Sequence, residues 1–246
     1  MPSRSQIDVA IIGGGVSGTS AGIFTARHGL ETVIFDTGTS ILRRNAHLEN
    51  YPGFPAGINA RLLLEMMRDQ AERAGCRVQN TQVEAIRHPD EQFVIETADG
   101  DSLTSRYVVA ATKNEVAYLD ELDGVEILDR GKQFVDTDRR GRTGVEGLYA
   151  AGRLALEPHQ TVISAGHGAK VGFTILEDDD EPFYQDWVAP EGYFTGRDRP
   201  VPPGCEEIDE DERLMREDTH LEVMRGYLAD HHPDRPQQHP SVEDDV

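Results

Sequence analysis

Apolar residues recur along the chain with two different periods, and these separate the predicted strands from the predicted helices. Short continuous apolar runs at residues 9–12 and 32–35 indicate buried strands. Residues 60–74 instead place leucines, methionines and alanines three and four positions apart, between Asn59 and Gly75. This spacing predicts an amphipathic helix that begins after an asparagine cap and ends at a glycine.

Further along the chain the pattern predicts three strands and one more helix. The strands are expected at residues 77–86, 92–97 and 102–111, with Asp99-Gly100 as the tight turn between the last two. They predict a β-meander, which we expect to cover the helix side of the sheet. Residues 207–229 predict a helix that must pack to be ordered, and the Pro-rich residues after 230 are expected to fray.

A glycine-rich turn joins the first strand to a helix. Gly13, Gly15 and Gly18 form a G-x-G-x-x-G pattern, and Asp36 ends the next strand 18 residues beyond Gly18. The glycines allow a tight turn, the close approach of a pyrophosphate and close helix packing, while the free N–H groups near Ser17 face the phosphates. An acid at this distance accepts hydrogen bonds from a ribose, so the βαβ unit predicts dinucleotide binding.

The charge of the chain is negative and unevenly distributed. The net charge is −21, and residues 177–246 contain 22 acidic and 6 basic residues, so most of the excess lies there. Lysine occurs three times, at Lys113, Lys132 and Lys170. A surface rich in acids and arginine but poor in lysine resembles that of proteins from salt-loving archaea. It argues against a nucleic-acid partner, which requires clustered positive charge.

Cysteine content and hydropathy argue against several further classes of protein. Cys76 and Cys205 lie far apart and form no C-x-x-C pattern, so neither a disulfide framework nor a metal site is predicted. No apolar run approaches the length of a membrane span, and the first residues lack the apolar segment of a signal peptide. We therefore expect a cytoplasmic protein without a membrane partner.

Two later segments carry a resemblance to a known family. Leu48-Glu49-Asn50-Tyr51-Pro52-Gly53-Phe54-Pro55 resembles the ENYPGFP segment of the thioredoxin reductase family, and Gly147–Gly152 resembles its A-A-G-D strand. Residues 164–169 are similar to the helix start that faces the flavin ring in that family. The resemblance implies FAD as the cofactor and covers residues 7 to about 176 in the family's order.

Several family features are missing or changed. Residues 114–141 are too few for the NADPH-binding domain that the family places there, and the redox C-x-x-C is absent. Lys113 replaces a glycine, Arg153 replaces the aspartate of G-D, and Arg43-Arg44-Asn45 replaces a Gly-Gly-Gln type loop. We therefore expect no thioredoxin reductase activity and no efficient reduction by NADPH.

These observations predict an α/β fold. Residues 1–176 would form a Rossmann-like FAD-binding domain with a parallel sheet and an inserted three-stranded β-meander, and residues 177–246 an acidic C-terminal extension with one helix. The expected cofactor-binding residues are Gly13, Gly15, Ser17, Gly18, Asp36, Asn45, Asn50, Val83, Thr112, Gly152, Arg153, Gln160, Ala165, Gly166 and Ala169. No catalytic residue and no metal ligand is predicted.

The function that follows is a flavoprotein oxidoreductase, and two alternatives stay open. One is a non-catalytic flavin or nucleotide sensor or partner subunit, and the other is a scaffold that binds no cofactor. The small-molecule or protein redox partner is unknown, and a homodimer is an open alternative. His47, His159 and His167 could tune a flavin or transfer protons, Tyr51 could stack near it, and Arg43 and Arg44 could meet an anion.

Overall fold

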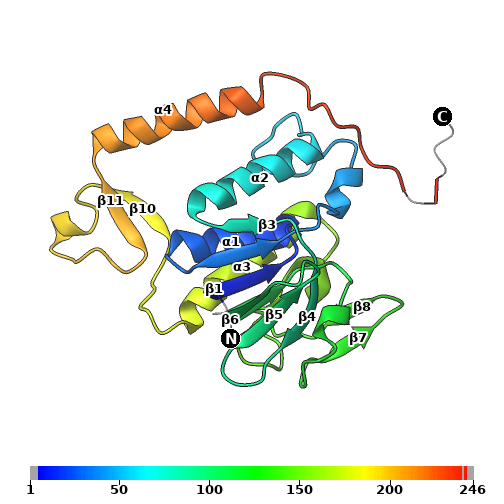
Figure 1. Cartoon of the computed structure of the whole chain (residues 1–246). Coiled ribbons are helices and arrows are strands. Elements are labelled where there is room, and N and C mark those ends of the chain that lie inside the picture. The colour runs from blue at the N-terminus through cyan, green and yellow to red at the C-terminus, as the bar shows by residue number, and fades with distance from the viewer. Residues whose placement is uncertain (1–4, 240, 243–246) are drawn as a thin grey trace. The chain divides into compact units, whose positions relative to one another are not determined.

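The computed structural model describes residues 5–239, 241 and 242, and it divides into two compact units (Figure 1). Unit 1 contains residues up to Ile175 together with the chain from Asp234 onward, and unit 2 contains Leu176–Pro233. The strands of unit 1 are β1 (Ser5–Ile12), β2 (Thr32–Phe35), β3 (Arg77–Gln79), β4 (Val83–Arg87), β5 (Phe93–Thr97), β6 (Ser102–Ala110), β7 (Ile127–Asp129), β8 (Gln133–Val135) and β9 (Leu148–Ala150). Its helices are α1 (Val16–Arg27), α2 (Ala60–Ala74), most of α3 (Thr161–Asp178), and the 3₁₀ turns η1 (Ile41–Arg44), η2 (Ala117–Leu119) and η3 (Gly152–Ala155).

Seven strands of the described chain form one sheet in the order β3-β2-β1-β6-β5-β4, with β9 also paired to β6. Strand β1 runs parallel to β2 on one side and to β6 on the other. The first half of β6 pairs antiparallel with β5, and its second half, Val108–Ala110, pairs parallel with β9. The predicted α/β fold with a parallel-rich sheet is therefore confirmed.

The helices and the meander cover opposite faces of the sheet. Ile11, Ile34 and Val109 point to one face, where they pack against Ala21 of α1 and Val171 of α3. The alternate strand positions point to the other face and pack against the meander; they include Ala10, Ile12 and Phe35 on the strands and Val83, Ile86, Phe93 and Ile95 on the meander. The expectation that the meander covers the helix side is wrong, because successive strand residues alternate between faces and both faces are apolar.

The first strand predicted for the meander is divided into two strands. Residues 77–79 form β3, which extends the parallel sheet beside β2, and residues 83–87 form β4, which pairs antiparallel with β5. The polar residues 80–82 break the run, and Ala98 donates a backbone hydrogen bond to the Gln82 carbonyl at 2.9 Å. The meander therefore consists of β4, β5 and β6.

Helix α2 has the ends that its sequence predicts. The Asn59 side chain accepts hydrogen bonds from the backbone N–H groups of Arg61 at 2.9 Å and Leu62 at 3.3 Å. Gly75 ends the helix with a φ of 110°, in the left-handed region that glycine adopts without strain. The buried residues Leu63 and Met67 pack in a third apolar cluster with Leu42 and Leu48.

Unit 2 is built on two short parallel strands, β10 (Trp187–Pro190) and β11 (Cys205–Ile208), followed by helix α4 (Glu210–Tyr227). The 3₁₀ turn η4 (Thr195–Arg197) separates the strands. The Glu207 carboxylate accepts hydrogen bonds from the backbone N–H groups of Gly192, Phe194 and Thr195 and from the Thr195 hydroxyl. Burial raises the pKa of Glu207, but these donors outweigh it and lower the pKa to about 2.

The predicted final helix begins later than expected. Glu207 belongs to β11, and α4 begins only after Asp209, whose side chain accepts a hydrogen bond from the Glu212 N–H at 2.8 Å. No described residue of α4 is buried. The residues expected to fray are partly ordered, since Gln237 donates a backbone hydrogen bond to the Arg43 carbonyl at 3.0 Å, and Pro240 lies outside the described residues.

Helix α3 packs so closely on the start of α1 that one of its glycines cannot carry a side chain. A Cβ atom at Gly168 would lie 2.0 Å from the Ser17 carbonyl oxygen, whereas one at Gly166, in the same helix, would meet nothing within 4 Å. We predict that Gly168→Ala destabilises the cofactor-free protein by about 1–3 kcal/mol through overpacking. The matched control Gly166→Ala should stabilise it by about 0.5–1 kcal/mol, because alanine is the better helix former.

Urea denaturation of the two variants beside the unmodified protein measures both effects. Equal midpoints for Gly168→Ala and the unmodified protein would contradict the packing described for α1 and α3.

Candidate functional site

A cavity of about 1480 Å³ opens in unit 1 at the carboxyl ends of β1, β2 and β6. This edge of a parallel sheet is where open α/β folds bind their ligands. The cavity exceeds the roughly 300–1,000 Å³ of most small-molecule pockets, so it has room for an extended cofactor. Its walls combine the glycine turn, the segment after β2, the loop after β6, η3 and the start of α3.

The glycines of the turn divide into those that the fold requires and one that faces the cavity. A Cβ atom would lie 2.6 Å from the Ala111 carbonyl oxygen at Gly13, 2.5 Å from the Asp36 side chain at Gly14 and 1.9 Å from the Gly13 carbonyl oxygen at Gly18. At Gly15 it would meet nothing closer than the Ser40 hydroxyl at 3.7 Å. Gly15 therefore leaves open a space that the protein itself does not fill.

The amino-terminal end of α1 faces this space. Gly15 is the N-cap of the helix and makes no side-chain capping hydrogen bond, and Gly15, Val16 and Ser17 all line the cavity. The first N–H groups of a helix have no partner within the helix and attract anions. The turn therefore presents backbone donors to a ligand at the position where a pyrophosphate binds in glycine-rich dinucleotide sites.

Asp36 lies at the other side of the turn, directly after β2. Its carboxylate lines the cavity and accepts a hydrogen bond from the Gly38 N–H at 3.0 Å. A carboxylate has further lone pairs for hydroxyl donors, as ribose recognition requires. Asp36 and the glycine turn are therefore placed to hold the two parts of a nucleoside diphosphate.

Most of the predicted site residues line this cavity. These are Gly13, Gly15, Ser17, Asp36, Asn45, Asn50, Val83, Thr112, Arg153 and Gln160. Asn50 and Gln160 lie 110 residues apart in the chain, yet the Asn50 amide donates a hydrogen bond to the Gln160 side-chain oxygen at 2.9 Å. Gly18, Gly152, Ala165, Gly166 and Ala169 are not among the lining residues.

The segment at residues 164–169 is not the start of a helix. Helix α3 begins at Thr161, so this segment lies in its first turns, and Thr161 and Ser164 line the cavity instead. Within this segment Gly168 packs closely on Ser17. Gly152 is also a packing position, where a Cβ atom would lie 2.7 Å from the Ser17 side chain.

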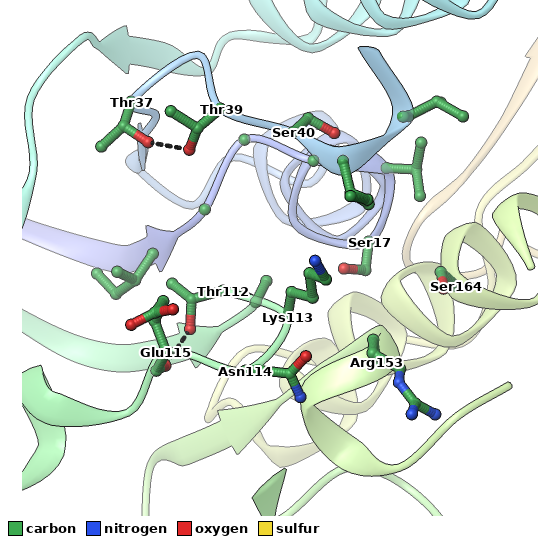
Figure 2. Close-up of a pocket in the computed structure, with 18 of the residues that line it drawn as sticks. Ser17, Thr37, Thr39, Ser40, Thr112, Lys113, Asn114, Glu115, Arg153 and Ser164 are labelled. Carbon is green, nitrogen blue, oxygen red and sulfur yellow. Dashed lines mark hydrogen bonds between the residues drawn. The ribbon is translucent and has the colours of Figure 1, made fainter. Parts of the chain in front are cut away.

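The end of the cavity around Lys113 is rich in positive charge. Lys113 occupies a left-handed position with a φ of 67°, which glycine adopts most easily, and its ammonium group points toward Ser17 in Figure 2. Burial lowers the pKa of Lys113, and repulsion from Lys132, Arg44 and Arg153 lowers it further, whereas Glu115 opposes the change. This end of the cavity therefore favours an anion.

The three candidate histidines occupy different environments. His159 lines the cavity, where burial and the charges of Lys113, Arg153 and Lys132 lower its pKa and favour the neutral ring. His47 is exposed and contacts Glu49 at 2.8 Å. His167 is buried below η3, and its Nδ1 accepts a hydrogen bond from the Gly152 N–H at 3.0 Å. Of the three, His159 is the one placed to exchange protons with a ligand.

Tyr51 and Arg43 do not line the main cavity. Tyr51 packs against Phe54, with the ring centroids 6.2 Å apart, in the cluster around α2. Arg43 borders a smaller neighbouring pocket, while Arg44, the next residue, lines the main one.

The β7–β8 hairpin supplies lining residues that the motifs did not indicate. Gly131 and Lys132 of its turn and Gln133 of β8 border the cavity. The hairpin lies between Thr112 and Arg153, which were both expected at the site, but no motif in the sequence marks these residues.

Comparisons with known proteins agree with this geometry. The model of the pyridine nucleotide-disulphide oxidoreductase family matches residues 58–168. The bifunctional thioredoxin reductase/thioredoxin of Mycobacterium leprae is 36% identical over 129 residues, which cover 50% of this chain and 28% of the relative. The thioredoxin reductase of Aquifex aeolicus is 33% identical over 107 residues, which cover 43% of this chain and 33% of the relative.

Solved structures show the same fold. The thioredoxin reductase from Gloeobacter violaceus aligns with a TM-score of 0.62 at 19% identity, covering 74% of this chain and 100% of that chain. The Lactococcus lactis thioredoxin reductase aligns with a TM-score of 0.63 at 14% identity, covering 70% and 98%. This chain contains a thioredoxin reductase-like FAD-binding domain. It spans about a third of the length of the curated relatives that it matches.

FAD, which the sequence predicted, is the cofactor of this domain type, and the residues present fit it. The open space at Gly15, the uncapped end of α1 and the Asp36 carboxylate suit the ADP half of the cofactor. The size of the cavity accommodates the rest.

Two further properties hold for the residues that the structure describes. Among them, no helix is long and apolar enough to cross a membrane. No group of three or more histidine, cysteine or acidic side chains in this part of the chain is arranged to hold a metal ion.

His167 makes the stability of the domain depend on pH. Burial and the charge of Lys170 lower its pKa from the ordinary value of 6.5, against the opposing effect of Glu157, so the folded protein keeps the ring neutral. Below that value the unfolded chain binds a proton that the folded protein does not. Stability is then fully present above pH 6.5 and decreases as the pH falls below it.

We predict that His167→Gln, which cannot be protonated, flattens this decrease in the cofactor-free protein. Urea denaturation between about pH 5 and pH 7 measures it, and the comparison is the change in unfolding free energy of each protein across this range. Parallel profiles for the variant and the unmodified protein would show that His167 is not the group responsible.

Proposed function

We propose that this protein is an FAD-dependent oxidoreductase whose electrons come from its substrate or from a docked redox protein. The observation that carries the proposal is the open position at Gly15, between the uncapped start of α1 and the Asp36 carboxylate. The protein leaves this space empty although it packs the other three glycines of the turn tightly. A backbone kept clear of side chains beside free N–H donors is what a bound pyrophosphate requires.

The residues of the chain then have distinct parts in the reaction. The glycine turn and Asp36 hold the ADP half and so position the remainder of the cofactor toward η3 and the start of α3. FAD, when bound, supplies the exchange of electrons with the substrate. His159 lies in this region as a neutral imidazole beside fixed cations, which suits it to accept a proton from a substrate group.

The region between Thr112 and Gly141 supports the view that NADPH is not the direct donor. Its described elements are η2 and the β7–β8 hairpin, and this is too little chain for a second nucleotide-binding unit. The thiols support the absence of disulfide reduction, since burial and the charge of Glu72 raise the pKa of Cys76 to about 12. A thiol with this pKa is almost entirely protonated at neutral pH and is a poor nucleophile.

Three further points are proposals: binding of a partner protein, association with a second copy of the chain, and a cytoplasmic location. Both cysteines are free in the structure, which agrees with a reducing compartment. Cell fractionation and sedimentation of the purified protein would test these points.

The first test of the proposal is binding of FAD. Titration of the cofactor-free protein with FAD should give saturable binding with the visible absorption of a protein-bound flavin. We predict that Gly15→Val lowers the affinity by about 100-fold or more, because it removes the pyrophosphate position and its charge-assisted hydrogen bonds. The melting temperature without FAD should change little, because the space at Gly15 is open.

The outcomes of this titration are distinct. Absence of FAD binding by the folded, unmodified protein would leave the scaffold alternative standing. Equal FAD affinity for Gly15→Val would mean that the cofactor binds elsewhere.

The second prediction concerns the electron donor. When NADPH or NADH is mixed anaerobically with the FAD-loaded protein, we expect only slow bleaching of the flavin band over many minutes. Fast hydride transfer needs the nicotinamide held within about 3.5 Å of the flavin and correctly aligned. Dithionite, which needs no binding site, serves as the positive control for a reducible flavin.

Bleaching by NADPH at the speed of catalysis would overturn this part of the proposal. A flavin that dithionite reduces but that no substrate or redox protein reduces would favour the non-catalytic alternative.

A further inference from the structure

Four side chains of unit 1 bring positive or potentially positive charge to one end of the cavity. They form the cation cluster: Lys113, Lys132, Arg153 and His159. Each comes from a different segment, namely the loop after β6, the turn of the β7–β8 hairpin, η3 and the loop before α3. Four segments that are distant in the sequence therefore each bring a basic side chain to the lining of the cavity, so the cluster is not a run of like charges in the sequence.

Two contacts hold the hairpin in this place. The Arg153 guanidinium lies over the Phe134 ring of β8, 4.9 Å from its centroid, and the Asn114 amide donates a hydrogen bond to the Gln133 carbonyl at 3.1 Å. Lys132 directly precedes β8, so the same contacts fix the position of its backbone beside Lys113 and Arg153. The hairpin therefore delivers one lysine to the cavity.

Arginines elsewhere in unit 1 form ion pairs with acidic side chains, whereas the two lysines of the cation cluster do not. Outside the cavity, ion pairs to aspartate or glutamate are made by Arg68, Arg73, Arg77, Arg87, Arg106 and Arg142. Within the described residues, neither Lys113 nor Lys132 forms an ion pair or a side-chain hydrogen bond. These are two of the three lysines in a chain with a net charge of −21.

Lys113 and Arg153 are partly buried and Lys132 and His159 are exposed. Holding like charges together is unfavourable unless an anion joins them. Burial lowers the pKa of Lys113 and of His159, and repulsion among the members of the cluster lowers both further, so these charges lie within electrostatic reach of one another. Glu115 opposes the lowering of the Lys113 pKa without reversing it, and the Asp129 carboxylate accepts a hydrogen bond from the Gly131 N–H at 2.8 Å in the hairpin turn.

We propose that the cation cluster is a binding subsite for an oxyanion, a phosphate or carboxylate group carried by the substrate. Lys113 and Lys132 would bind the anion as point charges, and Arg153, already stacked on Phe134, would offer the planar donors that suit phosphate and carboxylate. The inference rests on the proposed function in so far as the anion belongs to the substrate of the flavoprotein. It names the substrate as a small organic acid or phosphate ester.

The pyrophosphate of FAD is a second anion that these cations can bind. The residues involved distinguish a substrate anion from the pyrophosphate. The Lys113 ammonium points toward Ser17 at the start of α1, so it lies near both positions (Figure 2). Lys132 comes from the hairpin, on a segment remote in sequence from the glycine turn. A separate subsite therefore depends on Lys132, whereas pyrophosphate binding depends on Gly15.

The experiment is a calorimetric titration of the FAD-loaded protein with inorganic phosphate and, in a parallel arm, with succinate, at constant ionic strength. We expect saturable binding in at least one arm. Lys132→Gln should weaken it about ten-fold or more, the effect of losing one charge-assisted hydrogen bond, while the FAD affinity changes less than about two-fold. The matched control is Arg130→Gln, which removes the same charge from the same hairpin at a residue that does not line the cavity.

Three outcomes would overturn the proposal. No saturable binding in either arm, or an equal loss for Arg130→Gln and Lys132→Gln, would mean that there is no specific subsite. Binding seen only without FAD and displaced by FAD would assign the cations to the pyrophosphate. If the protein binds no FAD, the proposed function fails, and the same titrations of the cofactor-free protein decide this inference: anion binding that Lys132→Gln weakens and Gly15→Val does not would still support it.

Discussion

The close approach of backbones at the first turn of α1 is the constraint on which the rest of the site depends. The turn after β1 folds back on itself at Gly13 and Gly18, and α3 and η3 then pack on Ser17 through Gly168 and Gly152. None of these contacts leaves room for a side chain. The start of α1 is therefore fixed between the sheet and α3, and its free N–H groups are held at the edge of the cavity without any side chain to support them.

In the described part of unit 1, the balance of acidic and basic side chains differs between the outer surface and the cavity. Carboxylates outnumber bases in the sequence, and on the surface the arginines are largely engaged with them, in pairs that are individually worth little. In the cavity the balance is different, because four charged bases line it, Arg44, Lys113, Lys132 and Arg153, together with the acids Asp36, Glu115 and Asp129. An acidic protein can thus gather positive charge at one cavity, where the field of the grouped charges attracts anions.

The parts of the fold that local chemistry decides could be predicted from the sequence. The strand Thr32–Phe35 and the helix Ala60–Ala74 have the predicted bounds, because a continuous apolar run and a helix with both caps are specified by neighbouring residues. The glycine turn and Asp36 were also found correctly as neighbours in space, since a βαβ unit brings the ends of its two strands together. Strand β3 was merged with β4, because the sequence of residues 77–86 does not reveal that its first part pairs with β2 and its second part with β5.

What could not be predicted depends on contacts between distant residues. The glycines at 166 and 168 look alike in sequence, but only the second meets another backbone. The family resemblance at residues 164–169 placed the start of α3 too late, since the helix begins at Thr161. Lys132 shows the same limit for the site. Its hairpin has no motif of its own, and its position follows from Phe134 beneath Arg153 and from Gln133 bonded to Asn114. A residue whose function depends on where its neighbours are held can be recognised only once those neighbours have been located.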